Sequence, residues 1–235
     1  MVARNTGSCD PGLVSVLRPS IITAKTLGRT LGIWPFLFLI VWALVIRIQE
    51  PPFFARLGVE FFWSSQQAML LFGVGLLPLA WRLSQGAEAA KWVLRSARSG
   101  GLPVLSTWLG IVIYGGSLLV CGIFASAMIE MLTLHRMNEQ PFPWDRALSA
   151  MLHAGAFLIV TASLAPGLAL VPWSTTMVIF LWLPIQALAL QGFGPSKFLE
   201  VSGAATAVSG IVSTLLATLG GLAVSLAHAH HRLRH

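Results

Sequence analysis

The chain has 235 residues, of which 56% are apolar and only 10% charged, and its mean hydropathy is +0.79. Soluble domains carry about 25% charged residues, so this composition argues against a soluble enzyme, a disordered chain and a nucleic-acid-binding module. Two cysteines, Cys9 and Cys121, are too few for a disulfide-stapled secreted domain or a cysteine-only zinc site. We therefore expect an integral membrane protein.

The first 30 residues are expected to form a cytoplasmic amphipathic arm or tail. Apolar side chains recur at near-helical spacing over 13–22, with Arg18, Lys25 and Arg29 among them. This pattern is typical of a helix along the membrane interface, although Pro19 interrupts it. A partly disordered tail fits the same residues. We expect no cleavable signal peptide, because charges continue to Arg29 and no small-residue cleavage pattern follows the first apolar stretch.

Six transmembrane helices are predicted from stretches that lack charged residues. Each crossing needs about 20 mostly apolar residues, and a charge at the bilayer centre is costly. The charge-free run 147–196 is too long for one crossing, and Pro166 and Pro172 divide it, so one helix is expected to end at Pro166. The predicted fold is an all-α, six-helix transmembrane bundle with spans at 31–47, 60–82, 106–131, 148–166, 172–191 and 203–227.

The charge balance predicts the orientation of these spans. When both termini are cytoplasmic, the cytoplasmic segments hold ten of the 15 Lys and Arg residues but only two of the eight Asp and Glu residues. The positive-inside rule favours this arrangement. Anionic lipid headgroups then account for the basic net charge of +7. We expect a multi-pass protein, and the lack of a targeting peptide favours a bacterial plasma (inner) membrane.

A polar loop between the second and third spans contains a predicted amphipathic helix over 86–99. Glu88, Lys91 and Arg95 fall on one face at positions i, i+3 and i+7, and Trp92 lies among apolar side chains that are largely on other faces. A cytoplasmic helix that docks a partner has this pattern. A helix that lies flat among lipid headgroups has it too.

The order of these features resembles the membrane subunit of type-two ABC exporters, a family of six-span permeases. In that family an N-terminal amphipathic arm leads into the first span, and a cytoplasmic coupling helix precedes the third. The corresponding segments here are 13–29 and 86–99. The turn Gly86-Ala87-Glu88 before Trp92-Val93-Leu94 resembles the family's Gly-Thr-Leu-Glu before leucines. The family's acidic pair and its Thr-Leu-Glu are missing from this chain, and Leu102-Pro103 comes later than the family's Leu-Pro.

Three further segments resemble the haem-exporter branch of this family, which serves cytochrome c maturation. They are Gln49-Glu50-Pro51-Pro52, Ala165-Pro166-Gly167 and Leu183-Pro184. The substrate itself is not readable from the chain, because lipid, haem, peptide and drug molecules are all compatible with mostly apolar spans.

The resemblance implies a permease that moves its substrate by alternating access when a separate cytoplasmic ATPase engages the 86–99 helix. It also implies a second permease copy, as a homodimer or a heterodimer, and no cofactor. The chain has no Gly-x-x-x-x-Gly-Lys-Ser/Thr phosphate loop, so we expect no catalytic residue and any ATP hydrolysis to occur on a partner. The implied partner-coupling residues are Glu88, Lys91, Trp92 and Arg95.

A second interpretation is a non-catalytic structural or assembly subunit of a larger membrane complex, in which the loop helix only docks a neighbour. An intramembrane enzyme is disfavoured, because the predicted span interiors contain no Asp, Glu, Lys or Arg.

Polar residues within the spans have two interpretations each. A polar pathway lining, or hydrogen bonds between helices, fits Ser64, Gln66 and Gln67 near the outer end of the second span and Gln186 in the fifth. His153, the only histidine inside a span, fits either a packing role or a role as a proton or haem ligand. Tryptophans near the predicted span ends indicate an aromatic belt; they include Trp34, Trp63, Trp81, Trp108 and Trp144.

Small residues recur at every fourth position of the last span and predict a helix-packing face, within one subunit or across a dimer. Steps of four drift by about 40° on a 3.6-residue helix, so only local stretches of this stripe are expected to meet one partner. The C-terminal tail offers histidines as metal ligands, although no Cys, Asp or Glu lies nearby; lipid-headgroup contact or disorder fits it as well. The packing-face residues are Ala205, Ser209, Ser213, Ala217, Gly221 and Ser225, and the tail candidates are His228, His230 and His231.

Overall fold

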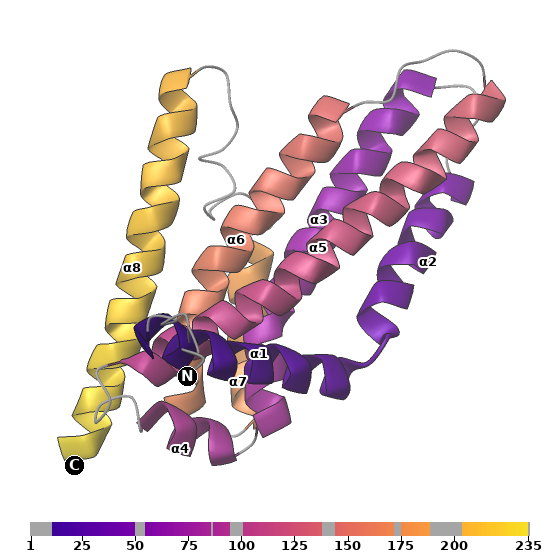
Figure 1. Ribbon diagram of the computed structural model, residues 1–235. Coiled ribbons are helices and arrows are strands. Elements are labelled where there is room, and N and C mark those ends of the chain that lie inside the picture. The colour runs from indigo at the N-terminus through magenta and orange to yellow at the C-terminus, as the bar shows by residue number, and fades with distance from the viewer. Residues whose placement is uncertain are drawn as a thin grey trace, which may run out of the picture.

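The computed structural model describes residues 11–49, 55–85, 87–94, 101–137, 144–171, 175–188 and 204–234. All regular secondary structure in these ranges is α-helical, so the all-α prediction is confirmed (Figure 1). The helices are α1 (Pro11–Leu31), α2 (Trp34–Gln49), α3 (Ala55–Gln85), α4 (Ala87–Leu94), α5 (Leu102–Met137), α6 (Trp144–Leu170), α7 (Thr175–Leu188) and α8 (Ala204–Arg234).

Several of these helices are suited to a lipid environment. Within the described residues, four are long and apolar enough to cross a membrane, in α3, α5, α6 and α8, and the pair α1–α2, bent by 62°, adds a fifth if it counts as one span. By themselves α2 and α7 have 16 and 14 residues, about 24 and 21 Å at 1.5 Å per residue, against a hydrocarbon core of about 30 Å. Large apolar side chains are also exposed along the helices, among them Val41, Phe124, Phe180 and Leu216.

The long helices run between the two ends of the bundle and lean in the same direction, α5 more than α8, and two helices lie at their lower end (Figure 1). α6 contacts α3, α5 and α8, while α7 packs against α3. α1 lies across the lower half of α5, and the short α4 lies at the bottom of the bundle. The chain bends by 62° from α1 into α2 at Gly32, whose φ of 59° favours glycine.

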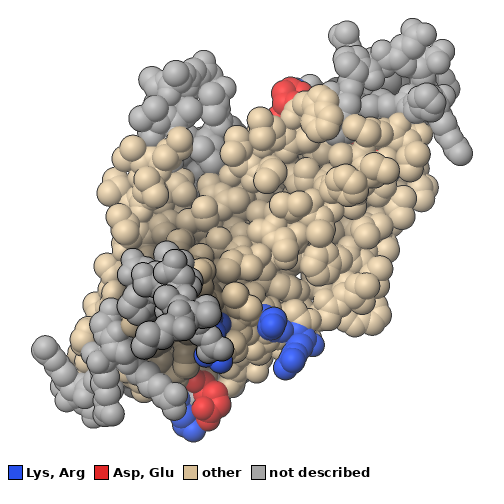
Figure 2. Space-filling model, viewed as in Figure 1, with Lys and Arg blue, Asp and Glu red and all other residues tan. Residues whose placement is uncertain are grey.

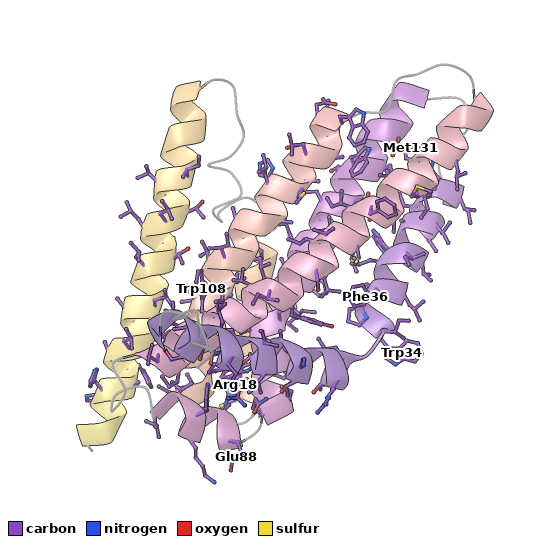
Figure 3. All side chains as sticks on the ribbon, in the orientation of Figure 1. Arg18, Trp34, Phe36, Glu88, Trp108 and Met131 are labelled. Carbon is purple, nitrogen blue, oxygen red and sulfur yellow. The ribbon has the colours of Figure 1, made fainter. Side chains whose placement is uncertain are left out.

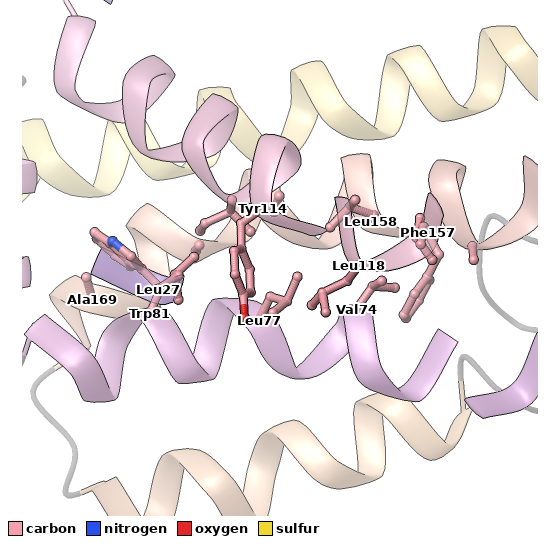
Figure 4. Close-up of a cluster of buried hydrophobic side chains, with 14 of the residues drawn as sticks. Leu27, Val74, Leu77, Trp81, Tyr114, Leu118, Phe157, Leu158 and Ala169 are labelled. Carbon is pink, nitrogen blue, oxygen red and sulfur yellow. The ribbon is translucent and has the colours of Figure 1, made fainter. Parts of the chain in front are cut away.

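A continuous apolar core joins α1, α3, α5 and α6 (Figure 4). Trp81 and Leu27 are fully buried at its lower end, next to Ala169 of α6, while Tyr114 and Leu118 of α5 face Val74 and Leu77 of α3. The close approach of α1 depends on Gly110 of α5. A Cβ atom there would lie 2.5 Å from Cβ of Thr23 and 2.6 Å from the backbone oxygen of Ser20.

The prediction that a helix ends at Pro166 is wrong. α6 continues through Pro166 to Leu170. The proline ring opens the helical hydrogen-bond ladder, and a side chain from α8 occupies the opening: Ser225 Oγ donates to the carbonyl oxygen of Ser163 at 3.0 Å and accepts from the N–H of Gly167 at 3.2 Å. The helix therefore survives its proline because a neighbouring hydroxyl supplies the missing contacts.

The aromatic belt is only partly as predicted. Trp34 and Trp144 are exposed. Trp63 and Trp81 are buried in the core, and the indole N–H of Trp108 donates to the carbonyl oxygen of Ile159 at 3.0 Å. Tryptophans near span ends can therefore join helices as well as anchor them in lipid.

Charged side chains lie at the two ends of the bundle. Figure 2 shows Lys and Arg at the lower end and a wide belt without charge above them. On α1 the cations are Arg18, Lys25 and Arg29, and all three are exposed. Arg82 lies in the last turn of α3 on this side. Its guanidinium donates a hydrogen bond of 3.0 Å to the carbonyl oxygen of Val171, the residue that follows α6. This charge-free belt is the surface expected of a protein embedded in a bilayer.

Candidate functional site

Helix α4 lies at the place predicted for the coupling helix, and its two faces differ. Ala89 and Val93, four residues apart, are fully buried against the bundle. Glu88 and Lys91 point the other way, with side chains 68% and 65% exposed, and form an ion pair of 2.7 Å (Figure 3). The predicted helix extends to residue 99; Arg95 lies outside the described residues.

The orientation of α4 is held by a hydrogen bond of Trp92 and by packing on α3, α5, α6 and α8. Trp92 is half-buried, and its indole N–H donates to Oγ1 of Thr107 on α5 at 3.2 Å. The apolar side packs against α6 and also touches α8, where Ala229 is fully buried. α4 is therefore fixed to the bundle by its apolar side and presents a charged edge.

A comparison with α1 separates two kinds of surface helix. α1 exposes large apolar side chains, among them Leu17, Ile21 and Ile22, next to its cations. The described residues of α4 include no large exposed apolar side chain. A helix that lies in the lipid interface immerses an apolar face in it. α1 has such an exposed apolar face, whereas the apolar face of α4 is packed against the bundle.

A hollow of about 290 Å³ separates α1 from α4 at the lower end. Trp81, which is almost fully buried, forms part of its wall, and Glu88 and Lys91 stand at its α4 side. The hollow therefore combines an apolar wall with a charged edge. Its other lining residues are Pro19, Ile22, Thr23, Thr26, Gln85 and Trp92.

The predicted pathway residues do not gather in one place. Gln66 is buried between α3 and α5, where its Oε1 lies 3.3 Å from Ser126 Oγ. Ser64 is exposed, and Gln67 is half-buried. The side chain of Gln186 lies outside the described part of the structure. The contact between Gln66 and Ser126 is the one expected of a hydrogen bond between two helices.

The fully buried carboxylate of Glu130 was not predicted from the sequence. Its exposed fraction is 0%, and it lies one turn after Ser126 on α5. Since α3 and α5 run in opposite directions, Phe62, one turn before Gln66, lies at the level of Glu130. The guanidinium of Arg47 stands over this Phe62 ring, 5.8 Å from its centre. The upper end of the bundle thus encloses the contact between Gln66 and Ser126 and, one turn further along α5, the buried carboxylate of Glu130.

A sequence signal for Glu130 exists, but it is weak. Glu130 follows Ser126 by four residues and stands between Ile129 and Met131, on a helix that continues to Met137. The predicted span 106–131 ends one residue after Glu130, so the sequence predicts that this carboxylate lies with the charges of the outer side. Because the helix extends further, this carboxylate is inside the packed bundle rather than beyond it.

Among its described residues, the small-residue stripe of α8 is buried near the C-terminal end of the helix, against α6. Gly221 and Ser225 are buried there, whereas Ala217 is exposed and Ser213 half-buried. The side chains of Ala205 and Ser209 lie outside the described set. The buried face of α8 passes through Thr214, Thr218, Gly221, Ser225 and Ala229, a helical spacing that crosses the four-residue stripe at Gly221 and Ser225.

Gly221 and Gly220 offer a matched pair of substitutions. A Cβ atom at Gly221 would overlap Ser163 Oγ, whereas one at Gly220 meets nothing within 4 Å. Both alanines gain the same helix propensity, so the difference isolates the contact. We expect Gly221→Ala to be less stable than Gly220→Ala by about 1–3 kcal/mol. Thermal unfolding in detergent measures this, and equal midpoints would contradict the tight α6–α8 contact.

His153 lies on α6, whereas the histidines of the C-terminal tail lie on α8. His153 is buried on α6, and its Nδ1 donates to the carbonyl oxygen of Ser149 at 2.7 Å. His228 is half-buried near the end of α8, whereas His230 and His231 are exposed. The described residues contain no group of three His, Cys, Asp or Glu side chains that could hold a metal ion. The hydrogen bond of His153 therefore joins it to the preceding turn of its own helix, as expected of a histidine in a packing role.

Comparisons of the chain with family models, with curated proteins and with solved structures give no match.

Proposed function

We propose that the chain is the membrane-spanning permease subunit of an ATP-driven exporter. In this proposal six spans cross a bacterial plasma membrane, both termini are cytoplasmic, and a second permease copy completes the pathway. A separate ATPase engages the helix 86–99 from the cytoplasm and drives alternating access by moving it. The permease itself does no chemistry.

One observation carries the proposal: the described residues of α4 include no large apolar side chain that is exposed. Its apolar side is buried on α6 and its charged edge, Glu88 and Lys91, faces outward. Such an edge suits a water-soluble partner, because exposed charges steer and align a protein interface. The hollow between α1 and α4 beside this edge offers an apolar wall, including Trp81 and Trp92, for a side chain of that partner.

The cations at the lower end support the orientation in this proposal. Arg18, Lys25 and Arg29 of α1 and Lys91 of α4 lie on the same side of the charge-free belt. The positive-inside rule makes that side cytoplasmic. An ATPase needs cytoplasmic ATP, so α4 stands at the end of the molecule where the partner must act.

Co-purification tests the proposal. The full chain is isolated from its native membranes in nanodiscs, and bound subunits are identified by mass spectrometry. We expect an ATPase with a Gly-x-x-x-x-Gly-Lys-Ser/Thr loop at a fixed ratio. Glu88→Arg reverses one charge of the α4 edge and is expected to reduce its recovery about tenfold, as loss of a charged contact at an interface does.

Asp145→Arg is the matched control, because it reverses an exposed acid at the opposite end of the bundle. We expect it to retain the ATPase. Recovery of a stable larger assembly without an ATPase would overturn the exporter proposal and favour the structural-subunit interpretation. Equal loss in both variants would overturn the role of α4.

A further inference from the structure

We infer that the bend between α1 and α2 is a binding site for one anionic glycerophospholipid. An apolar groove takes an acyl chain, and Lys25 and Arg29 hold the headgroup at the end of the groove nearest α1. This site goes beyond the proposed exporter function and depends only on the helices being embedded in a bilayer.

The groove lies between the first half of α2 and the middle of α3, and it also touches α5. Its volume is about 390 Å³, and every residue that lines it is apolar. Trp34 and Phe38 at its rim are 75% and 54% exposed, so the groove opens at the molecular surface. Figure 3 shows Trp34 at the bend. The residues that line the groove include Trp34, Phe38, Gly73, Leu77, Ala80 and Leu118.

The length of the groove matches one leaflet. Along α3 it extends from Ala80 to Met69, which is about 16 Å at 1.5 Å per residue. Half of a hydrocarbon core of about 30 Å is close to this length. Ala80 lies two residues before Arg82, at the charged end of α3, so the groove runs from the headgroup level towards the bilayer centre. A single acyl chain inserted from that leaflet fills it.

The charges at the α1 end of the groove fit a phosphate. Lys25 and Arg29 are four residues apart, exposed, and on the side of α1 opposite the buried Ser20 and Leu27. Leu31, the last residue of α1, lines the groove from the helix face that carries the buried Leu27, so the two cations lie on the outer face of α1 beside the groove and not in its wall. α1 contains no Asp or Glu over Pro11–Leu31.

The helix dipoles do not add to this field. α1 ends at Leu31 and α2 begins at Trp34, which itself lines the groove, so the negative end of one dipole and the positive end of the other meet at the bend and offset each other. Glu88, the acid on α4, is ion-paired with Lys91. The local field is thus positive where the apolar groove ends, which is the complement of an anionic headgroup on an acyl chain.

Native mass spectrometry of the full chain, released from nanodiscs or detergent, tests the site. The probes are phosphatidylglycerol, its single-chain lyso form, phosphatidylcholine and inorganic phosphate. We expect one retained phosphatidylglycerol, retention of the lyso form because the groove needs one chain, and no retention of phosphate alone. Each basic residue near an anionic surface contributes roughly fivefold in affinity. Lys25→Gln with Arg29→Gln should therefore lower phosphatidylglycerol retention by roughly 25-fold and leave phosphatidylcholine unchanged.

Gly73→Phe fills the groove. A Cβ atom at Gly73 meets nothing within 4 Å, so the ring enters the groove without a clash at its base. We expect loss of both phospholipids. Gly220→Phe on α8, also in open space, and Arg146→Gln at the opposite end are controls and should retain them. Gly73→Leu is a smaller second variant, and unfolding midpoints report whether each protein is folded.

Three results would each overturn the inference. They are undiminished retention of phosphatidylglycerol in folded Gly73→Phe or Gly73→Leu, equal retention of phosphatidylglycerol and phosphatidylcholine by the wild-type chain, and retention of inorganic phosphate as firmly as the lyso lipid. The wild-type comparisons require no variant to fold. An ATPase plays no part in these measurements, so failure here leaves the exporter proposal standing, and the reverse also holds.

Discussion

Replacing Gly110 by leucine is expected to detach α1 from the bundle. The glycine lies where α1 crosses α5, and a Cβ atom would meet Thr23 and the backbone oxygen of Ser20 at 2.5 and 2.6 Å. The obstacle is partly backbone, so a side-chain rotation cannot relieve it. We expect a loss of about 3 kcal/mol, the upper end of the usual cost of overpacking, and faster trypsin cleavage after Lys25 and Arg29.

Gly116→Leu is the control on the same helix. Six residues further along α5, a Cβ atom meets nothing within 4 Å, so leucine there adds only helix propensity. Thermal unfolding in detergent and limited proteolysis are compared for the two variants. If Gly110→Leu unfolds and is cleaved like Gly116→Leu, α1 is not held against α5 as the structure has it.

The helical architecture was predictable because the bilayer makes charge-free stretches stand out. The same reasoning was wrong at Pro166. A proline is expected to end a helix when the backbone groups that lose their helical hydrogen bonds find no other partner. Ser225, far away in the chain, satisfies that position, and no local pattern in the sequence announces it. Tertiary contacts therefore decide whether a proline ends a helix or only opens its ladder.

The candidate site was predictable in its position but not in its surroundings. The spacing of Glu88 and Lys91 predicts that the two side chains lie on one side of a helix; both lie on α4, where they form an exposed ion pair. The burial of Ala89 and Val93 depends on α6, and the hollow depends on α1 approaching α4 from the other side. Such contacts between distant segments have no signature in one sequence. This is also why Glu130 was assigned to the outer surface.

Replacing Glu130 by lysine is expected to destabilise the upper end of the bundle strongly. The carboxylate is fully buried one turn after Ser126, the hydrogen-bond partner of Gln66. Lysine reverses the charge at this buried position, and disruption of a buried charge arrangement costs about 3–5 kcal/mol. Glu130→Gln keeps the shape and hydrogen-bonding capacity, so a smaller loss is expected. Thermal unfolding in detergent measures both.

Asp145→Lys is the control, because Asp145 is an exposed acid at the same end whose ion pair with Arg146 is long, at 3.6 Å. Exposed pairs contribute about 0–1 kcal/mol, so we expect a stability close to that of the wild-type chain. A Glu130→Lys protein as stable as Asp145→Lys would show that the carboxylate reaches water and is not enclosed in the bundle.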